Sequence, residues 1–122
     1  MSSRAVDLVR GGDEEVVEAS LLDGMRPSDL ILVEREWGSV RASLMADLLE
    51  QNIPRRQWPE SLHWDWSKKA QELQLLAATG FGIRCEDRWQ GVMLTKTAGH
   101  GAHLVEDRGK PLVYIDYLEA AP

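Results

Sequence analysis

The chain has 122 residues, a mass of 13.7 kDa and a net charge of −6 at pH 7. The length predicts one domain over residues 1–122. The acidic balance disfavours nucleic acid and anionic membranes as partners, because both need a basic face. The sequence contains no apolar run of about 18 residues and no leader-like apolar segment, so we expect neither a membrane span nor a signal peptide. With Cys85 as the single cysteine, no internal disulfide can form, and we expect a cytoplasmic location.

The first half of the chain is predicted to be mainly helical after one short strand. Residues 3–10 alternate loosely between apolar and polar, which predicts a strand that ends at two glycines. Asp13 is a good N-cap residue, and apolar residues at helical spacing follow it. Gly38 is expected to kink the later helical region or to separate it into two segments. The helical segments predicted in this way cover residues 14–23, 27–37, 40–51 and 61–73.

The second half changes to the pattern of strands. Residues 81–85 and 90–95 predict an antiparallel hairpin around the turn that contains Glu86 and Asp87. Residues 97–110 predict a glycine-rich loop, and residues 112–118 carry the strongest strand signal of the chain. The predicted fold is therefore α+β with mostly antiparallel strands.

Two stretches of the second half resemble a known family. The hairpin with Gln90-Gly91-Val92-Met93 and the C-terminal string GKPLVYIDYLEAAP over residues 109–122 are similar to a bacterial branch of the GNAT (Gcn5-related N-acetyltransferase) family. The resemblance implies one strand, then helices, then three antiparallel strands. In that family a Q/R-x-x-G-x-G/A loop after the fourth strand binds the pyrophosphate of acetyl-CoA. The sequence stops at Pro122, where this loop should begin, so we expect a GNAT-like fold truncated after its fourth strand.

The resemblance also implies a chemistry, the transfer of an acetyl group from acetyl-CoA to an amine. A carboxylate at the end of the last strand would deprotonate the amine, with Glu119 the first candidate and Asp116 the second. Tyr117, Leu118 and Ala120 would contact the cofactor. The alternative interpretation of Glu119 and Asp116 is structural, because a strand-end carboxylate often pairs with an arginine or bonds the backbone.

A second group of residues is a candidate for binding the amine. Trp64, Asp65 and Trp66 lie together at the predicted start of a helix, where the indoles could contact a cation by cation–π interaction and Asp65 could attract it. Tyr114 could line the same pocket. The alternative is that the two tryptophans dock the helix on the sheet and that Tyr114 packs in the core.

A non-catalytic module is the alternative function. Without the pyrophosphate loop, the domain could bind a partner protein or a second copy of itself through the apolar strand 112–118, because an uncovered strand edge invites pairing. The enzyme interpretation implies a small-molecule or peptide amine as partner. His100 and His103 are too few for a zinc site, so no metal is predicted.

Overall fold

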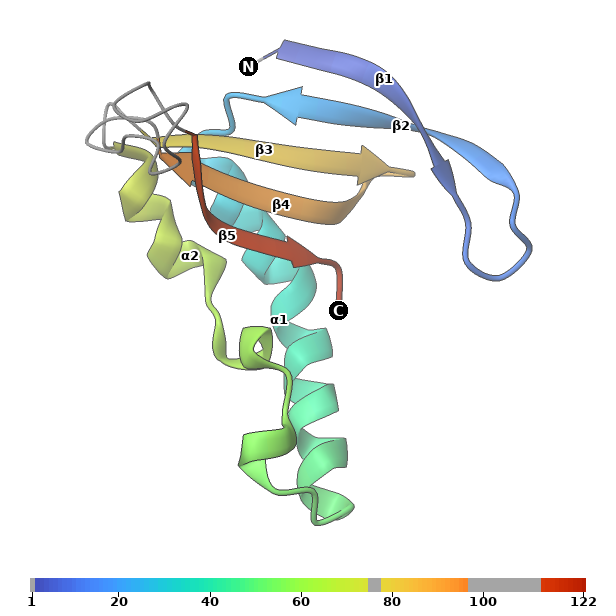
Figure 1. Cartoon of the computed structure of the whole chain (residues 1–122), viewed down its shortest axis with the longest axis vertical. Helices are drawn as coiled ribbons and strands as arrows, with labels where there is room; N and C mark the ends of the chain where they lie inside the picture. Colours follow the sequence, from blue (N-terminus) through green and yellow to red (C-terminus); the bar gives the residue numbers. More distant parts are fainter. Residues whose placement is uncertain (1, 75–77, 97–112) are drawn as a thin grey trace, which may run out of the picture.

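The computed structural model describes residues 2–74, 78–96 and 113–122, without the side chain of Tyr114. The fold is α+β and contains one antiparallel five-stranded sheet, whose spatial order is the order in sequence (Figure 1). The strands are β1 (Ser2–Val9), β2 (Val16–Asp23), β3 (Ala78–Cys85), β4 (Arg88–Lys96) and β5 (Tyr114–Ala120).

The helical segments of the described residues lie between β2 and β3 in sequence, and α1 and α2 lie on the same side of the sheet (Figure 1). The long helix passes under the sheet and then projects beyond it, with the segment that follows it packed alongside (Figure 1). None of the helices in the described part of the chain has the length and apolarity needed to cross a bilayer. The segments are α1 (Pro27–Glu50), α2 (Trp66–Lys69) and the 3₁₀ turns η1 (Arg55–Gln57), η2 (Glu60–His63) and η3 (Ala70–Gln74).

The predicted helix over residues 14–23 is wrong, because this segment is strand β2. Val16 pairs with Val9 across a hairpin, and pairing continues along the whole strand. Asp13 does bond to the backbone as predicted for an N-cap, but it accepts from Glu15 N at 3.0 Å within the hairpin turn. Turns and helix starts use the same side-chain hydrogen bond, so the local signal did not distinguish them. The sheet consequently has five strands rather than four, and the helices follow the second strand.

Two further helix boundaries differ from the prediction. Helix α1 continues through Gly38 without a break, since a glycine inside a helix costs only about 1 kcal/mol and packing can outweigh that. The predicted helix over residues 61–73 is divided into η2, α2 and η3. The predicted apolar face of this segment is confirmed, because Trp66 and Ala70 are buried and Leu73 packs against the core.

The predicted hairpin is confirmed as β3 and β4, with Glu86 and Asp87 both at positive φ in its turn. The last strand begins two residues later than predicted. Its pairing with β4 shifts register between Leu94, opposite Tyr117, and Thr95, opposite Ile115. Asp116 is therefore the extra residue of a bulge, which interrupts the predicted alternation along this strand.

The core lies between α1 and the sheet. Trp37 Nε1 donates to the carbonyl of Trp89 at 3.1 Å, and Glu36 accepts from Trp89 N at 3.0 Å. A side chain at Gly82 would lie 2.5 Å from the Trp89 ring, so only glycine allows this close approach. The buried cluster comprises Met25, Leu30, Val33, Trp37, Trp66, Ala70, Trp89, Val92 and Leu94.

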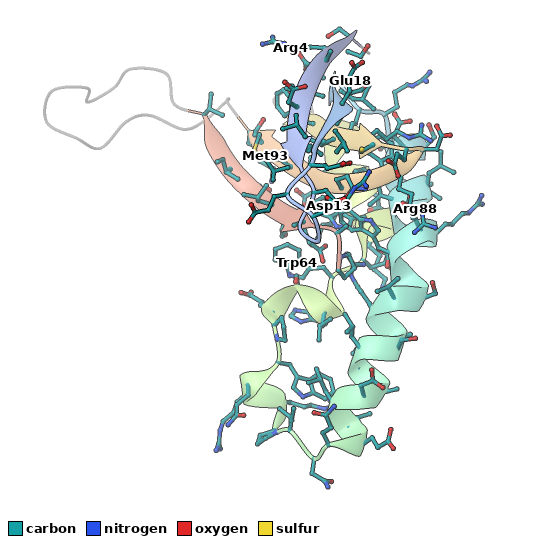
Figure 2. All side chains as sticks on the ribbon, turned by 90° about the vertical axis from the view of Figure 1, so that its right-hand side faces the viewer. Arg4, Asp13, Glu18, Trp64, Arg88 and Met93 are labelled. Carbon is teal, nitrogen blue, oxygen red and sulfur yellow. The ribbon has the colours of Figure 1, made fainter. Side chains whose placement is uncertain are left out.

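The opposite face of the sheet is apolar and open in the described structure. Figure 2 shows Met93 on this face and Trp64 on the helix side. Leu118 is 62 % exposed, and it borders a shallow apolar hollow of about 140 Å³ with Phe81, Ile83 and Met93.

Candidate functional site

Glu119 is buried on the helix side of β5 and is held by two hydrogen-bond donors. Arg41 Nη2, from α1, donates to Glu119 Oε1. Trp66 Nε1, at the start of α2, donates to the same oxygen at 2.7 Å. Because Glu119 and Arg41 are only 6 % and 2 % exposed, their ion pair is shielded from water and salt.

Glu34 provides a second carboxylate for the same arginine. Arg41 Nη1 donates to Glu34 Oε1 at 2.7 Å and to the carbonyl of Trp64 at 2.8 Å. Glu34 Oε2 in turn accepts from Trp66 N at 3.0 Å. Burial disfavours the charged guanidinium, but the hydrogen bonds to Glu34 and Glu119 outweigh it, so the pKa of Arg41 is raised above its ordinary value. We call Arg41, Glu34, Glu119 and Trp66 the Arg41 cluster.

Beside this cluster, Trp64 and Tyr117 form an aromatic corner. Their ring centroids are 5.5 Å apart and the rings are inclined by 79°. The amine of Lys69, from the last turn of α2, lies 3.6 Å from the Tyr117 centroid and 5.1 Å from the Trp64 centroid. Burial is the main reason that the pKa of Lys69 is lowered. Trp66 closes the base of the corner, with its ring edge-on to both others.

At the bulge of β5, a second charged group forms around Lys96. Its Nζ lies 2.8 Å from Asp116 Oδ2 and 3.3 Å from Glu72 Oε2. The three side chains are between 20 % and 29 % exposed. The ammonium of Lys96 lowers the pKa of Asp116, and Asp116 in turn raises the pKa of Lys96. We call Lys96, Asp116 and Glu72 the Lys96 cluster.

The amine of Lys69 links the two clusters electrostatically. It is attracted by Glu72, Asp116 and Glu119 and repelled by Arg41. Four carboxylates face three cations across the combined region, which leaves one net negative charge. A partly dehydrated region with aromatic walls and this charge favours an additional cation. The groups counted are Glu34, Glu72, Asp116 and Glu119 against Arg41, Lys69 and Lys96.

Several of the predicted site residues lie together at the aromatic corner and its two charged clusters, and others lie outside this region. Asp116, Tyr117 and Glu119 all contribute to this region. Leu118 and Ala120 are exposed and lie outside it.

Trp64 and Trp66 both lie in the candidate site, whereas Asp65 does not face it as a free anion. Asp65 caps α2 by accepting from Ser67 N at 2.9 Å, and the Ser67 hydrogen bond lowers the pKa of Asp65. The Tyr114 side chain lies outside the described residues, as do His100 and His103. Among the groups that the structure describes, no set of three or more His, Cys, Asp or Glu side chains is arranged to hold a metal ion.

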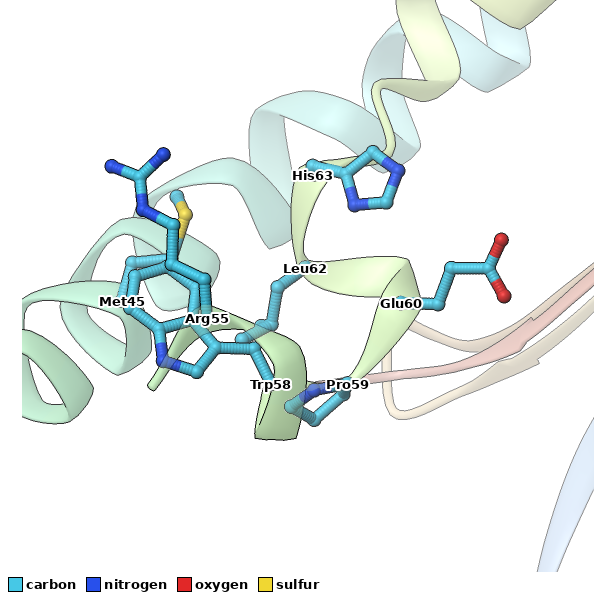
Figure 3. Close-up of a pocket in the computed structure, with 7 residues that line it drawn as sticks. All are labelled: Met45, Arg55, Trp58, Pro59, Glu60, Leu62 and His63. Atoms are coloured by element: carbon cyan, nitrogen blue, oxygen red, sulfur yellow. The ribbon is translucent and has the colours of Figure 1, made fainter. Parts of the chain in front are cut away.

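A further hollow lies away from these charges, against the second half of α1 (Figure 3). It measures about 500 Å³, and its walls are mostly apolar. Arg55 covers the Trp58 ring on one wall, and His63 and Glu60 lie on the other side (Figure 3). Size alone would favour this hollow, but none of the residues that line it takes part in an ion pair within the described part of the chain. We therefore place the candidate site at the aromatic corner and its two charged clusters.

Sequence reasoning did not select Glu34, Arg41, Lys69 or Lys96. A signal existed for the first two, because positions 34 and 41 lie two helical turns apart and carry opposite charges. No local signal connects either residue with Glu119, which is 78 positions beyond Arg41. Comparison of the chain with family models, with curated proteins and with solved structures finds no match.

Proposed function

We propose that the domain binds an amine at the aromatic corner and belongs to a GNAT-like N-acetyltransferase, in which acetyl-CoA donates the acetyl group. The observation that carries this proposal is the net negative, aromatic-lined region on the helix side of β5, which suits an ammonium acceptor. The order of elements in the C-terminal half, with a hairpin followed by an antiparallel strand, supports the same assignment. The free, buried thiol of Cys85 supports a cytoplasmic protein.

The two candidate bases differ in how they meet an amine. Glu119 is enclosed and already accepts two hydrogen bonds at Oε1, so its carboxylate is fixed in orientation. Asp116 is more accessible, but Lys96 stabilises its charged form and lowers its pKa, which weakens it as a base. Glu119 also has a cationic partner, Arg41, so only its fixed orientation keeps it the first candidate, with Asp116 the second.

The described residues fit the amine better than the cofactor. A CoA pyrophosphate needs backbone N–H groups at a loop or a helix N-terminus. At the start of α1, the one long helix in the described ranges, Asp29 Oδ2 already accepts from Arg26 N at 2.7 Å. The first turn of α1 thus carries an acidic side chain, which disfavours a pyrophosphate at this helix end. The cofactor contacts that we propose, by Tyr117, Leu118 and Ala120, are therefore limited to strand β5.

The first test is a calorimetric titration of the chain with acetyl-CoA, followed by a screen for acetylation of amines. Saturable binding and acetyl transfer support the proposal, whereas no binding at millimolar acetyl-CoA contradicts an autonomous acetyltransferase. In an active protein, Glu119→Gln should lower kcat/KM by about 10²–10⁴-fold if Glu119 is the base, while acetyl-CoA still binds. Full activity of Glu119→Gln together with a loss in Asp116→Asn would assign the role to Asp116.

A second candidate function is an interaction module, because β5 pairs only with β4 in the described sheet. Ile115 and Leu118 on this strand are 54 % and 62 % exposed, and an open strand of this kind can pair with another chain. Light scattering at high protein concentration should then detect a dimer that Leu118→Lys dissociates. Leu49→Lys, at a position 57 % exposed on α1, is the matched control. A monomer at all concentrations contradicts self-association.

A further inference from the structure

The amine of Lys69 lies in the aromatic corner and has no carboxylate in direct contact among the described residues. In the described structure no carboxylate oxygen lies within 4 Å of its amine, although three carboxylates attract it from farther away. Its contacts are the faces of Tyr117 and Trp64. The half-buried amine is thus held by cation–π contacts rather than by a direct ion pair.

We propose that Lys69 is an internal occupant of the ammonium-binding position between Trp64 and Tyr117, and that a ligand's alkylammonium group binds by displacing it. The ligand chemistry follows from the occupant, because the corner already accepts an ammonium at the end of an unbranched alkyl chain. This inference rests on the proposed amine-binding function. It adds that a side chain of the protein competes with the ligand for the same position.

The position of Lys69 makes displacement feasible. It belongs to the last turn of the four-residue helix α2, so its side chain can swing away without moving the sheet. Burial lowers the pKa of its amine, because the charged form loses hydration in this position. Release into water therefore recovers hydration while Trp64 and Tyr117 keep their mutual packing at 5.5 Å.

Lys68 provides a matched control within the same helix. It carries the same charge one position earlier, and it is exposed. It makes none of the cation–π contacts that Lys69 makes in the described structure. Replacing either lysine by methionine removes one positive charge and keeps a flexible chain, so only the vacated corner distinguishes the two variants.

The test is calorimetric titration of wild type, Lys69→Met and Lys68→Met with n-butylammonium, and separately with a short blocked peptide that contains one lysine. If Lys69 occupies the corner about nine-tenths of the time, Lys69→Met binds the probe about tenfold more tightly than wild type. Lys68→Met stays within about twofold of wild type. Preference for the amine or for the peptide identifies the ammonium source.

Equal affinities of Lys69→Met and Lys68→Met, or no binding by any form, overturn the inference. Lys69→Gln, checked by circular dichroism, replaces Lys69→Met if that variant does not fold, and the same tightening is expected. Trp64→Leu in the Lys69→Met background should abolish the gain. If Lys69→Met binds n-butylammonium more tightly than Lys68→Met but no acetyl transfer occurs, the proposed enzyme is refuted and this inference stands. If acetyl transfer occurs and the two variants bind the probe with equal affinity, the enzyme is supported and this inference is refuted.

Discussion

The Arg41 cluster and the Lys96 cluster contain similar groups, one cation between two carboxylates, but they differ in burial. Arg41, on α1, is 2 % exposed and donates hydrogen bonds to the Trp64 carbonyl in the segment before α2 and to Glu119 on β5. Lys96 is 28 % exposed at the bulge of β5. Charges that leave water must be compensated by partners, whereas charges at the surface are solvated and screened. Arg41 therefore links separate elements of the fold through buried bonds, whereas Lys96 and its partners stay in contact with solvent.

The largest effect should come from removing the buried cation. Arg41→Met leaves Glu34 and Glu119 close together without a counter-charge, and we expect a loss of about 3–5 kcal/mol in the free energy of unfolding. Urea denaturation measures it. Arg35→Met, at an exposed position of the same helix, should change stability by no more than about 0.5 kcal/mol. Equal small effects of both substitutions would remove the distinction between the two clusters.

A smaller effect of opposite sign on the free energy of unfolding is expected for a substitution at Gly38, which lies beside Glu34 of the Arg41 cluster. A methyl group there would lie 3.4 Å from Glu34 Oε1, which is ordinary contact. Because glycine costs more backbone entropy than alanine within a helix, Gly38→Ala should raise the free energy of unfolding by about 0.5–1 kcal/mol. Thermal unfolding can measure this. A destabilised Gly38→Ala would mean that the Glu34 side chain has no freedom to adjust.

The smallest effect should be the pH dependence of the Lys96 cluster. The folded-state pKa of Asp116 is lowered by Lys96, so the pair contributes stability above the ordinary aspartate pKa of about 3.9. That contribution is lost as pH falls from this value through the lowered pKa. The stability difference between wild type and Asp116→Asn should therefore be constant near neutral pH and shrink in acid. High salt should reduce it, and a difference that grows in acid would contradict the assignment.

In the C-terminal half, local sequence patterns were enough to predict the hairpin of β3 and β4. The turn at Glu86 and Asp87 and the two strands beside it were predictable, because alternating residues and a short turn specify a hairpin locally. The segment around residues 14–23 was not, since Asp13 and its apolar neighbours suit both a capped helix and a hairpin strand. Pairing with β1 decided between them.

Composition and residue patterns were enough to predict an acidic α+β fold with antiparallel strands. Glu119 and Asp116 became candidates through the family resemblance and their place at the end of an apolar strand, and Trp64 and Trp66 because they lie together at a predicted helix start. The surroundings of these residues follow from tertiary packing. The bulge at Asp116 directs this carboxylate to Lys96, and packing of α1 brings Arg41 to Glu119 across 78 positions. Hydrophobic periodicity specifies elements and their buried faces, whereas charge compensation depends on which side chains share a dehydrated space, and that is set by the packing of elements distant in sequence.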